Sequence, residues 1–326
     1  MQRTNVLAGS VNLMPVGPVA LVAELAAEAE RLGYHRCWVY DEGLATRDVY
    51  ITLAAVAAAT STIRIGPGIT NPFTRHPGVT ANAIASLDEY SGGRAFLGLG
   101  AGGGLTLDPL GIERRRPLAA VEEMLDSTRR LWSGARVDLH GRTIDLRAAS
   151  LSMARDGIEI HLAGRGPRMI ELAGRLADGF YLSYVHKELL GPTVETLRAV
   201  TARPMTVTYS TRIVVTDDDF EAARRDLTFR LPDSPPEVHE RLGIGPADVD
   251  GLRAALAEGG PSAAAHLVRD SWVTPFVIAG TRDECGRELA ELAAEHGLDE
   301  FLLQVNDLDA GSALMADTMA MISARS

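Results

Sequence analysis

The feature that most constrains the fold is an alternation of short β-like runs with amphipathic helical segments along almost the whole chain. Strands are expected at 5–13, 36–40, 63–69, 94–99, 158–163, 179–183, 205–215 and 301–305. Helices are expected at 18–32, 48–60, 77–90, 117–132, from 167 onward, 188–201, 282–296 and up to 321. Such alternation builds a parallel sheet covered by helices. Eight units predict a (β/α)8 TIM barrel, with a doubly wound open sheet as the alternative.

One long segment, 217–270, departs from this alternation. It contains short helical stretches broken by Pro232, Pro235-Pro236, Gly245-Pro246 and Gly259-Gly260-Pro261. Because it follows the seventh strand, we expect a helical insertion over the barrel end where strands finish, called the mouth below. The 326 residues are expected to form one barrel domain, 1–326, with 217–270 as the insertion.

Charge and cysteine content exclude several classes of partner. The chain has 43 acidic and 32 basic residues, a formal charge of −11, which argues against a nucleic-acid ligand. No stretch of 18 apolar residues occurs, so no membrane association is expected. The two cysteines, Cys37 and Cys285, lack metal-ligand spacing, which predicts reduced thiols, a cytoplasmic protein and no metal site. A small molecule is the expected partner.

A glycine-rich loop follows the fourth strand and matches G-x-G-x-x-G at 98–103. A dinucleotide fingerprint must open directly into a helix. Here Pro109 and Gly111 follow, and no helix is expected before about Pro117. We therefore interpret the loop as a place where backbone approaches a flat ligand closely, with a flexible surface loop as the alternative.

A second loop, 163–167, follows the fifth strand and ends at a helix start. Free N–H groups and the helix dipole make such a turn a seat for an anion, to which Arg165 could add a bidentate contact. A plain βα turn with Pro167 at the first helical position is the alternative.

Polar residues also follow the second and third strands, at the expected mouth. Asp41 and Glu42 follow one, and the rigid run 68–77, which contains Arg75 and His76, follows the other. The alternatives are that a carboxylate caps its loop, or that Glu42 is solvated. His161, which alternates with apolar residues, is interpreted as a hydrogen-bonded core residue.

The run Gly66-Pro-Gly-Ile-Thr-Asn-Pro-Phe-Thr-Arg-His-Pro77 resembles the luciferase-like flavin and deazaflavin oxidoreductase superfamily. Segments 86–89, 92–94, 98–100, 110–113, 164–167, 177–179 and 279–281 fall in the order seen in its methylenetetrahydromethanopterin reductase branch. The similarity covers nearly the whole chain. It implies a barrel, usually a homodimer, that binds coenzyme F420, with FMN as the cofactor of sister branches.

The resemblance also implies which residues hold the cofactor. A cis peptide at Gly68-Ile69 would support one face of the ring, and the 164–167 turn would bind the phosphate. The implied cofactor-binding residues are Tyr40, Asp41, Gly68, Ile69, Thr70, Asn71, Gly98, Gly100, Ala101, Gly102, Ala163, Gly164, Arg165, Gly166 and Pro167.

Three positions depart from the reductase pattern, near the expected chemistry. Asn12 stands where the reductases carry Glu, Glu42 where they usually carry His, and Gly103 where they carry Asp. Asn12, Arg75 and Gly103 are therefore expected to bind a different substrate.

The predicted reaction is hydride transfer between the deazaflavin C5 and a small organic substrate, reducing a C=C or C=N bond. Glu42 and His76 are the candidates for proton exchange, with Asp41 beside them. The alternatives are an FMN-dependent reductase or monooxygenase and a catalytically silent flavin-binding protein, the latter suggested by the two missing carboxylates.

Overall fold

Eight parallel strands form a single sheet in the order β3-β2-β1-β12-β9-β8-β7-β4. The computed structural model describes residues 7–201 and 203–324, so residues 5 and 6 of the first predicted strand lie outside it. The strands are β1 (Ala8–Leu13), β2 (Arg36–Val39), β3 (Arg64–Pro67), β4 (Phe96–Leu99), β7 (Glu159–Ala163), β8 (Gly179–Ser183), β9 (Thr206–Ser210) and β12 (Glu300–Val305).

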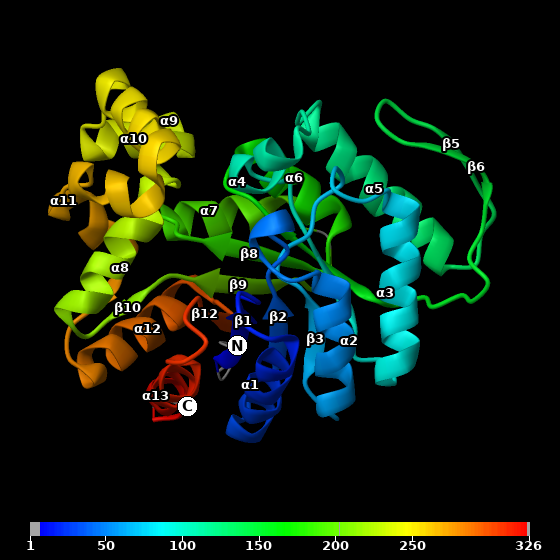
Figure 1. Ribbon diagram of the computed structural model, residues 1–326, viewed down its shortest axis with the longest axis horizontal. Helices are drawn as coiled ribbons and strands as arrows, with labels where there is room; N and C mark the ends of the chain where they lie inside the picture. The colour runs from blue at the N-terminus through cyan, green and yellow to red at the C-terminus, as the bar shows by residue number, and fades with distance from the viewer. Residues whose placement is uncertain (1–6, 202, 325–326) are drawn as a thin grey trace.

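The two edge strands of this sheet meet and close it into a barrel. The Ile65 N–H donates to the Arg94 carbonyl at 3.0 Å, and the Thr70 N–H donates to the Gly98 carbonyl at 3.0 Å. These bonds join β3 to the segment that contains β4, so no open edge remains there. The predicted (β/α)8 barrel is confirmed, and the doubly wound alternative is excluded (Figure 1).

Helices cover the outside of the barrel (Figure 1). They are α1 (Val19–Leu32), α2 (Val49–Ala59), α3 (Pro77–Ser91), α5 (Pro117–Trp132), α6 (Pro167–Leu176), α7 (Lys187–Val200), α12 (Arg282–His296) and α13 (Gly311–Ser323). Local signals set their ends. The Asp48 carboxylate accepts from the backbone of α2, Thr281 and Glu284 form a capping box on α12, and Gly33 ends α1 at φ 91°. Of the helices in the described part of the chain, none combines the length and apolar run needed to cross a bilayer.

A β-hairpin lies between α5 and β7. Its strands are β5 (Val137–His140) and β6 (Asp145–Ala149), which pair antiparallel. The Glu123 carboxylate of α5 binds the turn, accepting from the N–H groups of Arg142, Thr143 and Ile144. Burial raises the pKa of Glu123, but these bonds and the Thr143 hydroxyl outweigh it and bring the pKa to about 2.

The predicted strand 205–215 is wrong in its second half. β9 ends at Ser210, and β10 (Ile213–Val214) pairs with β11 (Ile278–Ala279) in a separate two-stranded sheet. The chain leaves the barrel at Thr211 and Arg212, because the Thr211 hydroxyl donates to the Phe276 carbonyl and the Arg212 guanidinium binds Asp226. Because these partners are distant in sequence, the apolar residues that follow Arg212 wrongly extend the predicted strand.

The segment after β10 is helical, as predicted. It holds α8 (Asp217–Thr228), η3 (Leu231–Asp233), α9 (Pro236–Leu242), α10 (Pro246–Ala264), η4 (Ala265–Leu267), α11 (Asp270–Val273) and η5 (Thr274–Phe276). It has a small core of its own, which includes Leu227, Leu252 and Trp272. In Figure 1 this insertion stands beside the barrel on the side of β8 and α7, opposite the β5–β6 hairpin.

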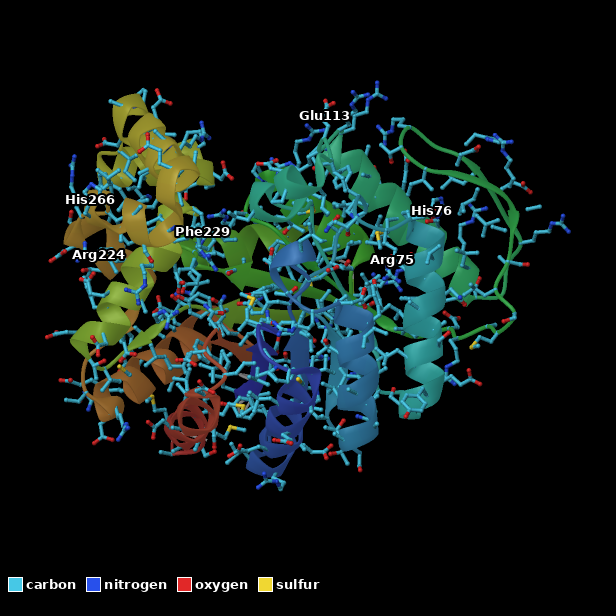
Figure 2. All side chains as sticks on the ribbon, in the orientation of Figure 1. Arg75, His76, Glu113, Arg224, Phe229 and His266 are labelled. Atoms are coloured by element: carbon cyan, nitrogen blue, oxygen red, sulfur yellow. The ribbon has the colours of Figure 1, made fainter. Side chains whose placement is uncertain are left out.

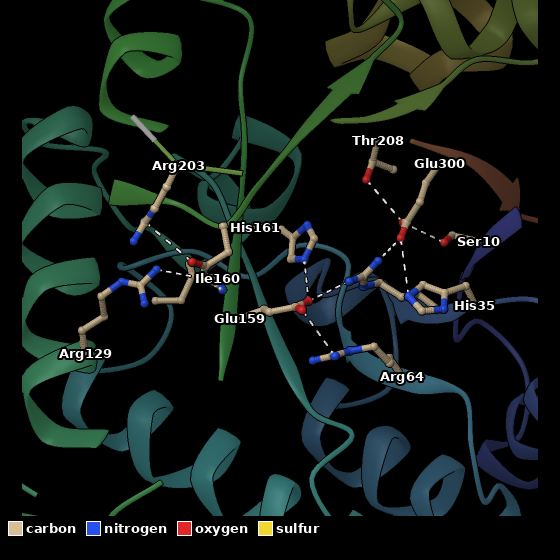
Figure 3. Close-up of polar contacts among 12 residues, drawn as sticks. Ser10, His35, Arg64, Arg129, Glu159, Ile160, His161, Arg203, Thr208 and Glu300 are labelled. Carbon is tan, nitrogen blue, oxygen red and sulfur yellow. Dashed lines mark hydrogen bonds and ion pairs between the residues drawn. The ribbon is translucent and has the colours of Figure 1, made fainter. Parts of the chain in front are cut away.

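The amino-terminal end of the barrel interior is filled by an ionic network (Figure 3). Arg36 pairs with Glu300 and with Glu159, the latter at 2.6 Å, and Arg64 pairs with Glu159 at 3.3 Å. His161 is fully buried, with Nε2 3.3 Å from the Glu159 carboxylate, so its predicted place as a hydrogen-bonded core residue is confirmed. The side chains of Trp38, Phe96 and Leu302, also fully buried, pack in the same interior.

Candidate active site

The floor of the mouth is made by inward-facing side chains near the carboxyl ends of the strands. The Asn12 amide nitrogen donates to the Gly68 carbonyl at 2.7 Å, and the Gln304 amide nitrogen donates to the Tyr181 hydroxyl at 3.1 Å. Asn12 and Gln304 are register partners on β1 and β12, and each keeps a buried amide oxygen without a hydrogen-bond partner. Asn12 is fully buried and holds the Gly68 carbonyl, and its predicted contact with the substrate stays a prediction.

The Gly68–Ile69 peptide is cis, as the resemblance implies. An added Cβ on Gly68 would lie 2.6 Å from the Trp38 Cβ, so only glycine fits there. At Gly98 a Cβ would lie 2.1 Å from the Pro67 carbonyl oxygen, and at Gly100 it would lie 2.3 Å from the Ile69 Cδ1.

These distances show what the missing side chains of the glycine-rich loop make room for. At Gly98 the close neighbour is the last residue of β3, and at Gly100 it is the side chain of Ile69, which follows β3. The absence of a side chain at these glycines thus makes room for the Pro67 carbonyl and the Ile69 side chain, and their predicted contact with a cofactor stays a prediction.

The expectation that no helix begins before Pro117 is wrong. A single turn, α4 (Gly104–Leu107), continues into η2 (Asp108–Leu110) before Gly111 ends it at φ 65°. Four residues are much shorter than the helix that a dinucleotide fingerprint requires, so that interpretation gains no support. Of the glycines before α4, Gly102 has φ 70°, and a Cβ on Gly103 would meet no atom within 4 Å. Open space therefore adjoins Gly103, where a substrate contact is predicted.

Asp41 and Glu42 lie at the mouth, each bound by a threonine. The Thr70 hydroxyl donates to the Asp41 carboxylate at 2.6 Å, and the Thr106 hydroxyl donates to Glu42 Oε2 at 2.5 Å. Burial raises the pKa of both carboxyls, although each threonine bond lowers it. The Asp41 charge raises the pKa of Glu42 further, so the protonated form of Glu42 is favoured more than in an exposed glutamate.

The Asn71 side chain forms hydrogen bonds to neighbouring residues of its own loop. Its side-chain oxygen accepts from the Phe73 N–H at 2.9 Å and from the Thr74 N–H at 3.0 Å, an Asx turn that shapes the loop after β3. The side chain is buried, and the predicted contact of Asn71 with a cofactor stays a prediction.

Arg75 and His76 lie on the flank of the barrel opposite the insertion (Figure 2). The Arg75 guanidinium is 3.3 Å from the Asp48 carboxylate and stacks 4.2 Å from the centre of the Tyr50 ring. His76 is exposed and caps α3, with Nδ1 accepting from the Gly78 N–H at 3.1 Å. Both side chains thus have structural partners, and their predicted roles toward substrate stay predictions.

The 163–167 turn has the form expected of an anion seat. Gly166 is the N-cap of α6 and offers no side chain to its free N–H groups, while Pro167 begins the helix. An added Cβ on Gly166 would meet nothing within 4 Å. Arg165 donates to the Arg230 carbonyl at 3.3 Å, and burial together with the Arg230 charge lowers the pKa of Arg165 to about 10.

A cluster of polar and aromatic side chains that was not predicted from the sequence joins the insertion to the mouth. Tyr184, directly after β8, has φ 49°, and its hydroxyl donates to the Asp226 carboxylate at 2.5 Å. Arg212 donates to the same carboxylate at 2.8 and 2.9 Å, and the Arg230 guanidinium stacks 4.1 Å from the centre of the Tyr184 ring. Tyr184 could have been found from its place after a strand, whereas its insertion partners could not.

A pocket of about 240 Å³ lies next to this cluster. Arg165, Pro167 and Tyr184 line one part of it, and α7 and the insertion contribute Leu189, Val238 and other apolar side chains. No group of His, Cys, Asp or Glu side chains that could hold a metal ion occurs within 7–201 and 203–324.

Comparison with known proteins gives a consistent result. The family described as luciferase-like monooxygenase matches residues 8–300. The 5,10-methylenetetrahydromethanopterin reductase of Methanolobus tindarius is 33% identical over 292 residues, covering 86% of this chain and 89% of the relative. That of Archaeoglobus fulgidus is 34% identical, covering 81% and 83%. The solved coenzyme F420-dependent tetrahydromethanopterin reductase of Methanopyrus kandleri superposes with a TM-score of 0.84 at 25% identity, covering 98% and 99% of the two chains.

Proposed function

This chain belongs to the luciferase-like monooxygenase family, and from that premise we propose that it is a coenzyme F420-dependent oxidoreductase. The observation that carries the proposal is similarity to 5,10-methylenetetrahydromethanopterin reductases, 33% and 34% identical over more than four fifths of this chain. The reaction is hydride transfer between the deazaflavin and a small organic substrate, in the direction of reducing a C=C or C=N bond. The substrate differs from that of the reductases, because Asn12, Glu42 and Gly103 replace residues of their pattern.

The residues present fit such a cofactor. A phosphate needs N–H donors and positive charge, which the uncapped start of α6 and the Arg165 side chain offer. A flat ring needs space and hydrogen-bonding groups, which the open side of Gly103 and the unpaired oxygen of Gln304 offer. When bound, the deazaflavin supplies or accepts the hydride.

The protein's own residues would hold the cofactor and orient its ring. Asn12 holds the Gly68 carbonyl, and Thr70 is held through its N–H to Gly98 and its hydroxyl to Asp41. The segment Gly68 to Thr70 is therefore fixed from two strands and would support one face of the ring. A preorganised surface of this kind costs no rearrangement during the reaction.

Glu42 is the residue that we assign to proton exchange. Its pKa is raised by burial, and the Thr106 bond occupies Oε2, which leaves Oε1 to carry the proton. A general acid needs a pKa close to the working pH, which this environment favours. His76 is a weaker candidate, because its Nδ1 is used to cap α3 and the ring faces solvent.

We also propose that the protein is a homodimer in the cytoplasm. Exposed apolar side chains on α2 and α3, among them Ile51 at 65% and Val79 at 52%, give a surface that a second copy could cover. Cys37 and Cys285 are buried free thiols, as expected where disulfides do not form.

The test is titration of the purified protein with F420 and, separately, with FMN, followed by tryptophan quenching and cofactor fluorescence. We expect F420 to bind more tightly than FMN. Tighter FMN binding would move the protein to the FMN-dependent reductases and monooxygenases, and binding of neither would refute the cofactor assignment.

A screen with reduced F420 and unsaturated or imine substrates then tests catalysis. Turnover of any of them supports the enzyme. Tight F420 binding without turnover across the screen would favour the catalytically silent alternative.

A further inference from the structure

We propose that Arg230 of the insertion is an anion-binding residue of the mouth, which together with Arg165 receives a carboxylate or phosphate group of the bound ligand. The proposal rests on the proposed function only in taking the mouth as the place where ligand binds. It names the ligand's chemical class: at least one group with a permanent negative charge.

The Arg230 side chain is held in place by two aromatic rings. Its guanidinium carbon lies 4.1 Å from the centre of the Tyr184 ring and 4.6 Å from that of Phe229. One nitrogen donates to the Asp226 carbonyl at 3.3 Å. Stacked guanidinium groups keep their in-plane N–H donors free, so Arg230 can still form a bidentate contact.

Arg230 is close to the mouth. Tyr184, on which it stacks, follows β8, and Figure 2 shows Phe229 on the side of the insertion that faces the barrel. The Arg230 charge also lowers the pKa of Tyr40 and Glu42, which follow β2, although burial of both groups raises it more. A side chain of the insertion thus acts electrostatically on the proposed proton-exchange residue.

Arg230 has no ion-pair partner among the described residues. Within 7–201 and 203–324, no carboxylate lies at ion-pair distance from Arg230 or Arg165. The carboxylate of Asp226, the nearest acid along the chain, is taken up by Arg212 and Tyr184.

Two other arginines of the insertion also stack on aromatic rings, but each of them has an acidic partner. Arg224 stacks on Phe220 and pairs with Asp270, and Arg269 stacks 4.5 Å from the centre of the Trp272 ring and pairs with Asp248 at 3.2 Å. Figure 2 places Arg224 on the side of the insertion away from the barrel. Among these ring-stacked arginines, only Arg230, facing the barrel, lacks an acidic partner.

Arg165, which likewise has no ion-pair partner among the described residues, brings a second positive charge to the same place. It donates to the Arg230 carbonyl at 3.3 Å, and burial and the Arg230 charge lower its pKa more than the Asp233 charge raises it. Two neighbouring cations repel each other, and an anion between them would remove that cost. The anion could be the phosphate of the cofactor or an acidic group of the substrate; the chemistry that binds it is the same.

The experiment is calorimetric titration with inorganic phosphate, on the protein without cofactor and on the F420-loaded protein. Three variants are compared with the wild type: Arg230→Met, Arg230→Lys, and Arg269→Met as the control that removes a neutralised arginine from the same insertion. Circular dichroism melts check that each variant folds.

We expect Arg230→Met to weaken phosphate binding by about tenfold or more in the cofactor-free protein. Arg269→Met should bind as the wild type does, and Arg230→Lys should keep part of the affinity, because it keeps the charge. Loss of the Arg230-dependent binding after F420 loading assigns the anion to the cofactor; its persistence assigns it to the substrate.

Equal phosphate affinity in Arg230→Met, Arg269→Met and wild type, without cofactor and with it, would overturn the proposal. Equal loss in Arg230→Met and Arg230→Lys would do the same, since packing rather than charge would then explain the loss. If neither F420 nor FMN binds the wild type, the proposed function fails, while the cofactor-free titration still decides on Arg230.

Discussion

Replacing Gly98 by alanine should destabilise the barrel at the seam between β3 and β4. An added Cβ would lie 2.1 Å from the Pro67 carbonyl oxygen and 2.7 Å from the Trp38 Cζ3, whereas ordinary contacts begin near 3.4 Å. The backbone at Pro67 would have to withdraw by about 1 Å, and it is a strand backbone rather than a flexible side chain. Because Thr70 bonds to the carbonyl of Gly98, the displacement would pass directly to the proposed ring-supporting segment.

Overpacking of a close-packed interior costs about 1 to 3 kcal/mol, and a clash with backbone falls at the upper end. With an unfolding entropy of about 2.1 cal/mol/K per residue, ~3 kcal/mol lowers the Tm of a chain of 326 residues by about 4 °C. The assay is urea and thermal unfolding of Gly98→Ala, with F420 titration of the folded variant. We expect both lower stability and weaker F420 binding.

The matched control is Gly103→Ala, in the same glycine-rich segment. Its Cβ would meet no atom within 4 Å, and its φ of −118° suits any residue. Both replacements restrict the unfolded chain equally, so the difference between them isolates the clash. If Gly98→Ala is as stable as Gly103→Ala, the reasoning from packing at the seam is refuted.

Three further predictions concern single side chains. Glu42→Gln should lower turnover while F420 affinity stays nearly unchanged. Because the protonated carboxyl of Glu42 donates the proton to the substrate, wild-type activity should fall as pH rises through the raised pKa of Glu42. The pH profile of kcat/KM measured on the variant should lack this fall. His76→Ala should cost about 1 kcal/mol of stability in urea unfolding through loss of the α3 cap, whereas His76→Asn, which keeps an acceptor, should not; equal stabilities would contradict the cap role. The pKa of Glu123 is about 2 in the folded protein and about 4.3 in the unfolded chain, so its ionised carboxylate stabilises the fold fully above pH 4.3 and loses this effect as pH falls toward 2. The urea midpoint of Glu123→Gln should therefore lie below that of the wild type at pH 7, and the two midpoints should converge near pH 2.

The barrel could be predicted because its signal is local and repeated. Each strand and its helix carry their own periodicity and end signals, such as Pro77 in the first turn of α3 and Gly33 after α1. The overextended strand 205–215 shows the limit: the apolar residues continue past Ser210, and what ends the strand is the contact of Arg212 with Asp226, 14 residues away.

The site could be predicted only in part, for related reasons. The sequence identifies the loops at the mouth, because they follow strands. It does not show which neighbour a glycine accommodates: at Gly98 that neighbour is the last residue of β3, and at Gly100 it is the side chain of Ile69. Nor does it show that Asn12 faces inward beneath Gly68, or that an arginine of the insertion folds back onto Tyr184. These facts depend on contacts between distant segments.

The filled interior of the barrel has a kinetic consequence. Within the described residues, the ionic network of Arg36, Glu159 and Glu300 and the buried rings above it fill the amino-terminal end of the barrel interior. We therefore expect cofactor and substrate to enter by the same route, through the mouth. We expect the one that lies deeper to bind first and leave last, so that steady-state kinetics show an ordered rather than a random mechanism.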